Sequence, residues 1–256
     1  MPPKDHTNAL ETFRIAGLPP DFYYIPNFIT VEEEASILQK IPAQRWTHLT
    51  HRRLQAHPST LTKNNTLLAS PLPAYLTNPV VQRFKEYGIF DNTPHQQPNH
   101  VLINEYRPGE GIMPHEDGSA YAPVVATVSL GGSLCLDITA KPGSSGEVDE
   151  SNTADEDQDQ NLEAYKVPTR VFQEPRSLLI TTGEAYRNLM HGIASIEVDE
   201  NLSAETVANW SLLGDQRVIA QNGGQSTREI RVSLTYRDVL KVSSAASKVL
   251  GGFGKR

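Results

Sequence analysis

The sequence has 256 residues, of which 38% are hydrophobic and 21% are charged. This length and composition exclude a coiled coil, a collagen and a wholly disordered chain, and they suit one large domain with a substantial core. The formal net charge of −7 excludes a basic surface over the whole molecule. No run of about 18 apolar residues is present, so no membrane partner is expected. The one cysteine, Cys135, excludes an internal disulfide and favours a reducing compartment, the cytoplasm or the nucleus.

Two helices are predicted in the N-terminal part of the chain. Residues 30–41 have an amphipathic pattern that begins with a capping box, in which Thr30 is paired with Glu33. A second helix is expected to begin with Asn78 as its cap and Pro79 in its first turn, and to end at Gly88. Residues 1–98 are therefore predicted to form an N-terminal extension with supporting helices and room for a substrate lid.

From Asn99 onward the pattern changes to short strands separated by turn residues. Gly131-Gly132 and Gly183-Glu184 are typical of tight hairpin turns, whereas residues 200–228 are expected to form a long, mostly irregular connection. Such a series indicates a mainly β, α+β fold built on a sandwich or barrel, with its core in residues 99–240 and a tail at 241–256. The candidate strands are 100–107, 123–130, 133–138, 176–182, 185–190 and 230–238.

Most of the acidity lies in one segment between two predicted strands. Residues 141–166 contain eight acidic and two basic side chains, a net charge of −6, which leaves −1 for the rest of the chain. The segment has few apolar residues and is expected to be a disordered acidic loop. It is either a solvated insertion without function or an acidic decoy that competes with nucleic acid.

Candidate metal ligands lie in the segment PHEDG at 114–118. Positions i and i+2 of an extended chain point to one face, so His115 and Asp117 can bind one ion, with His191 as the natural third ligand. Two imidazoles and one carboxylate form the facial triad of Fe(II) oxygenases, which leaves open positions for a co-substrate and O₂. Two alternatives remain: a zinc site for hydrolysis, or a histidine that is merely hydrogen-bonded at a strand end.

The last predicted strand alternates cleanly between apolar and polar residues. Arg231, Ser233 and Arg237 share one face, and two buried arginines are costly unless an anion compensates them. Their Cα atoms are roughly 20 Å apart, so two long side chains that lean together leave a gap suited to a short dicarboxylate. Asn104 and Tyr106 share a face of the strand that leads into the metal motif and are candidates to orient the same acid. The alternative is a polar strand face in solvent.

With these residues in place, the chain resembles the AlkB family of Fe(II)/2-oxoglutarate dioxygenases over about residues 10–240. Within that family, the segment FYYIPNFI at 22–29, the string GEGIMPHEDG and the run RVSLT are most similar to the branch of AlkB homologue six. The segments that carry the family likeness are NEYRPGEGIMPHEDG (104–118), RSLL (176–179), LMHGI (189–193) and RVSLTYR (231–237).

The resemblance implies a double-stranded β-helix, or jelly roll, with flanking N-terminal helices. It implies that Fe(II) is bound by the three metal ligands and that 2-oxoglutarate is held by Arg231 at its distal carboxylate and by Arg237 near the metal. It also implies that Asn104, Tyr106 and Ser233 assist, although Ser233 stands where some relatives have asparagine. The reaction would couple oxidative decarboxylation of 2-oxoglutarate by O₂ to hydroxylation of a C–H bond, and an oxidised N-methyl group would leave as formaldehyde.

Relatives of this family often hold nucleic acid with a lid, and here the corresponding region is residues 45–57. It combines basic side chains with Trp46, as expected for a loop that follows phosphates and stacks on bases, and it predicts a single-stranded or alkylated nucleic acid as partner. A solvated hairpin with Trp46 anchored in the core explains the pattern as well. His57-Pro58-Ser59 replaces an aromatic residue followed by glycines, which departs from the relatives.

Two other functions remain open from the sequence. An oxygenase that acts on a protein side chain or a small molecule needs no basic surface. A non-catalytic nucleic-acid-binding module could retain the fold, although the complete triad and both arginines argue against it. The sequence gives no indication of the oligomeric state.

Overall fold

The computed structural model describes residues 7–142 and 166–244. The predicted acidic loop therefore lies almost wholly outside the described residues. The six helices are α1 (Thr7–Glu11), α2 (Val31–Lys40), α3 (Ala74–Thr77), α4 (Val80–Glu86), α6 (Gly183–Asn188) and α7 (Gln216–Gln221), within the described ranges. The strands are β1 (Phe22–Ile25), β2 (Thr47–Leu49), β3 (Arg52–His57), β4 (Thr66–Ala69), β5 (His100–Tyr106), β6 (Ile112–His115), β7 (Tyr121–Gly131), β8 (Leu134–Ala140), β9 (Thr169–Gln173), β10 (Leu178–Thr182), β11 (Leu189–Ile193), β12 (Val198–Asp199), β13 (Ser226–Thr227), β14 (Arg231–Val239) and β15 (Lys241–Ser244).

Two antiparallel sheets form the centre of this mainly β, α+β fold. The larger has the order β1-β10-β7-β14-β5-β3-β2, and the smaller has the order β6-β11-β8-β9. From β5 onward the chain passes repeatedly between them: β5, β7, β10 and β14 belong to the large sheet, and β6, β8, β9 and β11 to the small one. Strands far apart in the sequence therefore become neighbours, and β14 lies between β5 and β7.

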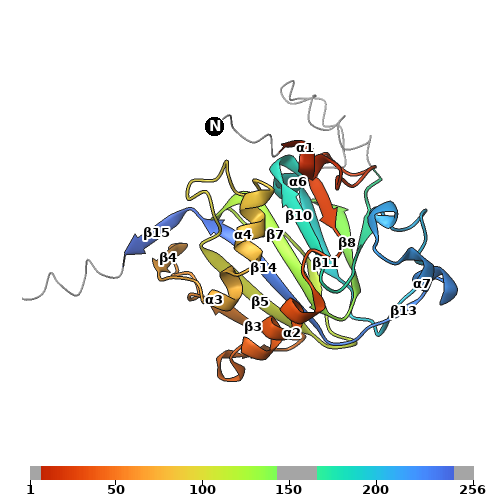
Figure 1. The fold of residues 1–256 in the computed structure, drawn as a ribbon, viewed down its shortest axis with the longest axis horizontal. Coiled ribbons are helices and arrows are strands. Elements are labelled where there is room, and N and C mark those ends of the chain that lie inside the picture. Colours follow the sequence, from red (N-terminus) through yellow and green to blue (C-terminus); the bar gives the residue numbers. More distant parts are fainter. Residues whose placement is uncertain (1–6, 143–165, 245–256) are drawn as a thin grey trace, which may run out of the picture.

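The two faces of the large sheet have different partners because its strands alternate. On β14, the apolar side chains Val232, Leu234 and Tyr236 belong to the core cluster that includes residues of α2, α3 and α4. Figure 1 shows these three helices grouped beside β3, β5 and β14. The polar side chains of the same strand point the opposite way, toward the small sheet. The predicted alternation of the strand is thus confirmed.

The predicted helix at 30–41 is confirmed as α2. The Thr30 side chain accepts a hydrogen bond from the Glu33 amide and the Glu33 carboxylate accepts one from the Thr30 amide, which completes the capping box. Both terminal nitrogens of Arg83 on α4 donate to Glu33, at 2.7 and 2.8 Å. This bidentate pair joins the two helices that cover the sheet.

The second predicted helix needs a correction at its start. Asn78 ends the short helix α3, and α4 begins after Pro79 without a side-chain cap. Val80, Val81 and Phe84 on α4 are buried.

The prediction of a hairpin at Gly131-Gly132 was wrong. β7 and β8 belong to different sheets, so the two glycines carry the chain from one sheet to the other. Both positions pass close to backbone: a Cβ on Gly131 would lie 2.5 Å from the Ile230 carbonyl oxygen, and one on Gly132 would lie 2.8 Å from that of Glu229. Glycine is needed at both positions because another backbone segment passes too close for a side chain, and not because the chain makes a two-residue turn.

The strand predicted at 185–190 was also wrong, together with the hairpin at Gly183-Glu184. Residues 183–188 form α6, and β11 begins only at Leu189. The Asp21 carboxylate accepts hydrogen bonds from the amides of Glu184 and Ala185, at 3.1 and 3.5 Å, and so satisfies donors at the start of this helix. This partner, distant in the sequence, cannot be seen from local alternation.

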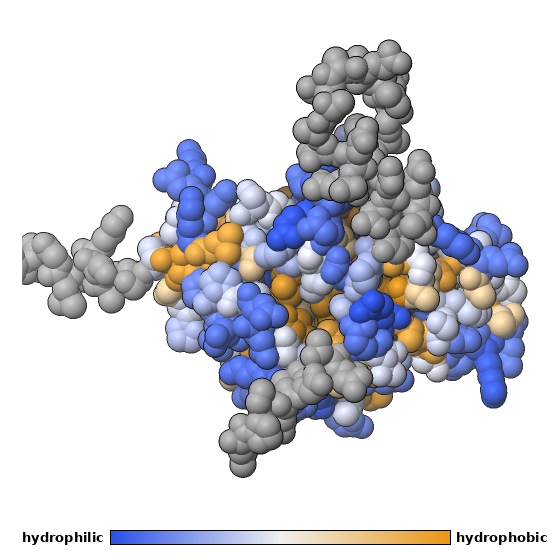
Figure 2. Space-filling model, turned by 90° about the horizontal axis from the view of Figure 1, so that it is seen from above, coloured by the Kyte–Doolittle hydropathy of each residue, from blue (hydrophilic) through white to orange (hydrophobic). Residues whose placement is uncertain are grey.

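The remaining connection from 200 to 228 is mostly irregular, as expected, although it contains the short helix α7. At the other end of the molecule, β15 pairs in parallel with β4. Leu68, Leu240 and Val242 are exposed there, and Figure 2 shows apolar surface at that end. No helix among the described residues is long and apolar enough to cross a membrane.

Candidate active site

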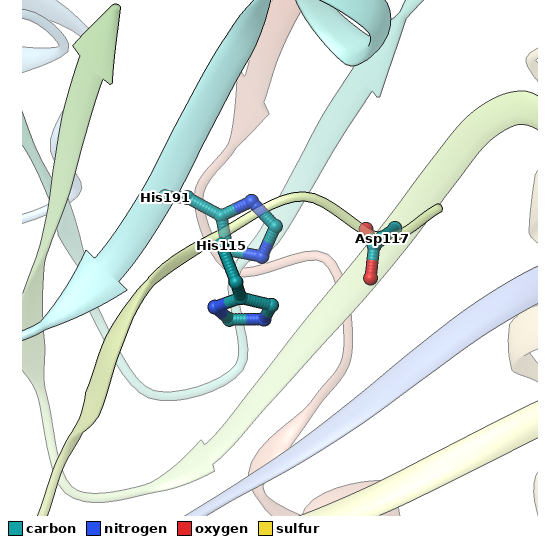
Figure 3. Close-up of side chains that lie close together, drawn as sticks. All are labelled: His115, Asp117 and His191. Atoms are coloured by element: carbon teal, nitrogen blue, oxygen red, sulfur yellow. The ribbon is translucent and has the colours of Figure 1, made fainter. Parts of the chain in front are cut away.

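The three predicted metal ligands meet between the two sheets. His115 ends β6 and His191 lies directly across from it on β11, with ring centroids 4.5 Å apart. Asp117 lies on the loop that follows β6, beside the two rings (Figure 3). One potential ligand atom from each residue lies within 4.8 Å of those of the other two. The predicted convergence of residues 115, 117 and 191 is therefore present in the structure.

Hydrogen bonds orient this group. The Nδ1 atom of His115 donates to the carbonyl oxygen of Met113 at 2.9 Å, which orients the ring so that Nε2 is the nitrogen that can bind a metal. The hydroxyl of Tyr186 on α6 donates to the Gly118 carbonyl oxygen at 2.7 Å. Because Gly118 follows Asp117 directly, this bond fixes the loop that carries the carboxylate.

The charges at the site favour ligands that are ready to bind a cation. Burial lowers the pKa of His191 to about 4, so its ring is neutral at physiological pH. Burial alone would raise the pKa of Asp117, but Arg237 and the two histidines hold it below its usual value. Arg237 also forms an ion pair with this carboxylate. Two imidazoles and one carboxylate are the donor set that Fe(II) accepts.

A cavity of about 300 Å³ extends from the triad between the sheets. The inward residues of β14 form its floor, and Leu136, Ile138 and Gln173 of the small sheet lie opposite. All five residues predicted to hold the co-substrate line this cavity: Asn104, Tyr106, Arg231, Ser233 and Arg237.

The large sheet sets the spacing of these five residues. Arg231 pairs across β14 and β5 with Tyr106, and Ser233 pairs with Asn104. Side chains at directly opposed positions project to the same face, so these four come from two adjacent rungs of the ladder. Arg237 lies six residues farther along β14, at the end where Asp117 is found.

Arg231 is held by two neutral partners that the sequence analysis did not identify. Its Nη2 atom donates to Ser129 Oγ at 2.8 Å and to Gln173 Oε1 at 2.5 Å. Ser129 also donates to Gln173, at 2.9 Å. Burial lowers the pKa of Arg231 to about 10, so it remains a cation at neutral pH. Its Nε atom is buried and has no hydrogen-bond partner among the described residues, which fits a guanidinium that receives an anion from the cavity.

Gln173 and Ser129 gave no recognisable signal in the sequence. Gln173 ends β9, a strand that the analysis of alternation did not predict, and Ser129 lies near the end of a predicted strand. Tyr186 was placed on a predicted strand and lies on a helix instead. Their roles depend on contacts across the fold, such as the one between β7 and β9 side chains, which no local motif encodes.

The predicted lid at 45–57 is a hairpin, and it is part of the large sheet. β3 pairs with β5 from Arg53↔Glu105 to His57↔Val101, and β2 pairs only with β3. Trp46 packs against the main core cluster, in agreement with the anchored alternative.

Two of the basic residues expected to follow phosphates have partners within the protein. Arg53 binds Glu105 at 2.6 Å and lies over the Trp46 ring. Arg45 contacts His57 and two backbone carbonyl oxygens.

Comparison with known proteins gives one matching family and several similar proteins. Residues 21–237 match the 2OG-Fe(II) oxygenase superfamily. The chain is 37% identical over 239 residues to the probable RNA/DNA demethylase ALKBH6 of Danio rerio, a match that covers 92% of this chain and 93% of that protein. It is 28% identical over 230 residues to an uncharacterized protein of Acanthamoeba polyphaga mimivirus, which covers 86% and 85% of the two chains. The solved structure of OsALKBH1 superposes with a TM-score of 0.49 at 15% identity, over 86% of this chain and 98% of that chain.

The superfamily match spans most of the chain and includes the triad, the paired arginines and both sheets. Fe(II) and 2-oxoglutarate are the cofactor and co-substrate of this family, and the donor set between the sheets suits the metal. The chain belongs to the 2OG-Fe(II) oxygenase superfamily, in its AlkB-like branch, and is a dioxygenase.

Proposed function

We propose that this dioxygenase removes or hydroxylates an alkyl group on a nucleic acid. The observation that carries the proposal is one cavity that combines the triad with two arginines on β14. The likeness to a probable RNA/DNA demethylase over nearly the full length of both chains supports the nucleic acid as the substrate.

In this proposal His115, Asp117 and His191 hold Fe(II). The iron, when bound, supplies the activation of O₂, with 2-oxoglutarate as the source of two electrons, and so enables a substrate C–H bond to become C–OH. Arg237 holds Asp117 ionised and in place and lies at the metal end of the co-substrate. The protein needs no general base of its own, because its residues bind and orient the reactants.

Arg231 binds the distal carboxylate of 2-oxoglutarate in this proposal. The Nε atom that lacks a partner makes it suited to a bidentate contact with two oxygens. Tyr106, which lies directly opposite Arg231 on β5, adds a hydroxyl, and Asn104 and Ser233 add polar groups one rung closer to the metal end. Buried side chains around the cavity exclude water from the reaction.

The proposal includes a double-stranded β-helix as the core of the fold. Its support is that eight strands, β5 to β11 and β14, divide equally between two antiparallel sheets, with repeated crossings from one sheet to the other. In such an arrangement residues from β6, β11 and β14 reach one cavity from both sides.

The test is a demethylation assay with methylated single-stranded oligonucleotides. We expect equimolar succinate and formaldehyde from the wild type and none from His115→Ala, whose folding is checked by thermal unfolding. Succinate formation that depends on the triad, but is stimulated only by a methylated peptide or small molecule, would contradict the nucleic-acid substrate and favour the other class of oxygenase.

A further inference from the structure

Arg52 lies where two hollows of the molecule meet. It lines the inner cavity beside Asn104 and Tyr106, and it also lines an outer groove of about 580 Å³. The groove runs between the tip of the hairpin and the ends of β6 and β11. Its lining consists of Leu49, Thr50, His51, Arg52, Gly111, Ile112, Met113, Pro114, Asp137, Gly192, Ile193, Ala194 and Ser195.

The Arg52 guanidinium is only partly engaged by the protein. Its Nε atom donates to the side-chain oxygen of Asn104 at 3.3 Å, a long hydrogen bond. Among the described residues no carboxylate lies within ion-pair distance of it, in contrast to Arg53 beside Glu105. The terminal nitrogens of Arg52 are therefore available to a ligand.

The charges of the loaded site favour an anion at this position. With Fe(II) and dianionic 2-oxoglutarate bound, the ion, Asp117, the co-substrate, Arg231 and Arg237 together carry +1. In the part of the chain that the structure describes, the one other carboxylate that lines the cavity is that of Glu116, which is paired with Lys141. With Arg52 included, the net charge of the loaded site becomes +2. Because the site is partly buried, water screens this charge weakly.

The outer groove itself carries little positive charge that could bind a polyanion. Of the described residues that line it, Arg52 is the one lysine or arginine, Asp137 is an acid, and most of the others are apolar or small. Such a lining suits an uncharged ring or alkyl group better than a run of phosphates.

From these observations we infer that Arg52 determines specificity by binding a single anionic group of the substrate, next to the group that is oxidised. This inference rests on the proposed function, and it makes the substrate an alkylated nucleotide recognised through one phosphate, not through a track of phosphates along a strand.

The test is the salt dependence of binding. A fluorescein-labelled single-stranded ten-nucleotide DNA is titrated into the Mn(II)- and 2-oxoglutarate-loaded protein between 25 and 200 mM NaCl, and anisotropy is measured. Each phosphate that is neutralised on a single strand contributes about 0.7 to the slope of log K against log salt. For the wild type we expect log K to fall with log salt with a slope of about 0.7. For Arg52→Ala we expect a slope near zero and roughly tenfold weaker binding at low salt. Arg52→Lys should have an intermediate affinity and retain the slope of the wild type.

Two controls distinguish a local contact from a general charge effect. Arg217→Ala removes one positive charge from the exposed face of α7, and it should bind as the wild type does. Binding of 2-oxoglutarate is followed separately in the anaerobic Fe(II) protein by its visible absorption band, and it should change less than twofold in Arg52→Ala.

Each other outcome overturns the inference in a different way. If the wild type binds and Arg52→Ala retains its affinity and slope, the inference fails and the nucleic-acid substrate stands. If Arg217→Ala loses as much affinity for DNA as Arg52→Ala does, Arg52 acts only through the overall charge of the protein. If Arg52→Ala loses as much affinity for 2-oxoglutarate as for DNA, Arg52 binds the co-substrate and not the nucleic acid. If the wild type does not bind the DNA at any salt concentration, the nucleic-acid substrate fails and the inference fails with it.

Discussion

Arg231 illustrates how much a single buried cation depends on neutral neighbours. Ser129 and Gln173 both accept a hydrogen bond from the Nη2 atom of its guanidinium, and Ser129 also donates to Gln173. The other guanidinium nitrogens remain available to a ligand in the cavity. Because a bidentate contact requires a fixed plane, the two partners are expected to influence co-substrate affinity without contacting the metal.

Replacement of Gln173 tests this role. We expect Gln173→Ala to raise the KM for 2-oxoglutarate about tenfold, since roughly 1.4 kcal/mol of orientation is lost, while the bound iron per chain stays the same. Steady-state succinate formation and metal analysis measure the two effects. Gln221→Ala, on the exposed end of α7, serves as the control, and an unchanged KM in Gln173→Ala would contradict the role.

Two buried histidines outside the triad predict how stability depends on pH. Burial lowers the pKa of His57 and of His100 to about 4, and nearby Arg45 and Arg237, respectively, lower it further. In the unfolded chain both would protonate near 6.5. The unfolded state therefore takes up protons first, and stability that is present above pH 6.5 is lost as the pH falls toward 4.

Chemical denaturation of the metal-free protein between pH 5 and 6.5 measures this loss. Each histidine contributes up to about 1.4 kcal/mol per pH unit to the slope of the unfolding free energy. We expect His100→Gln to reduce the slope by that amount and His48→Gln, at an exposed position, to leave it unchanged. A slope that is the same in wild type and His100→Gln would rule out the explanation.

At the scale of elements, the hairpin β2–β3 is a continuation of the large sheet and not a separate flap. Its strand β3 is bonded to β5 over five residue pairs, and its side chains divide between two faces. Arg52 points into the cavity, whereas Arg53 lies on the opposite face with Glu105 and Trp46.

The two adjacent arginines should therefore behave differently. Arg53→Ala would leave Glu105, whose side chain is 7% exposed, without its close cationic partner. We expect a loss of about 1–3 kcal/mol in the free energy of unfolding, with most of it recovered in Arg53→Ala/Glu105→Gln. Urea denaturation measures it, and Arg187→Ala, whose partner Glu184 is exposed, should cost less than about 0.5 kcal/mol. Equal losses in both variants would refute a structural role for Arg53.

The elements with local signals could be predicted from the sequence. The capping box identified α2, and strict alternation identified β14 with the correct inward residues. The turn signals Gly131-Gly132 and Gly183-Glu184 misled because a hairpin turn, a crossing between sheets and the start of a helix all use glycine. Only distant partners distinguish these cases, such as the Glu229 and Ile230 carbonyls or the Asp21 carboxylate.

At the scale of the whole molecule, charge is distributed unevenly along the chain. The segment 143–165 contains eight acidic residues and no basic ones, so the formal charge without it is +1 in place of −7. The described residues on either side of it lead to β8 and β9, which pair from Leu134↔Gln173 to Ile138↔Thr169. A short linker can therefore replace the segment at small cost in stability.

Replacement of residues 143–165 by a short Gly-Ser linker distinguishes the two interpretations of this segment. If the acids compete with nucleic acid, the shortened protein should bind labelled single-stranded DNA severalfold more tightly at 25 mM salt, and the gain should disappear at high salt. An exchange of the eight acids for their amides should give the same result at unchanged length. Equal affinity in all three proteins would identify a solvated insertion.

The assembly of the site could be predicted only in part. His115, Asp117, His191 and the arginines of β14 stand out because their residue types and spacing are rare outside such sites. The cavity wall that Gln173 contributes, and the direct pairing of His115 with His191, depend on how the chain passes between two sheets. That path is set by long-range strand pairing, which local patterns do not encode.

Because β3, β5 and β14 are consecutive strands of one ladder, Arg52 is separated from the co-substrate arginines by two strand spacings, about 10 Å across the sheet. The strand pairing therefore holds these side chains at fixed positions relative to one another. A substrate must place its anionic group at Arg52 and its alkyl group at the triad at the same time, so the enzyme should select its substrates by the distance between these two groups.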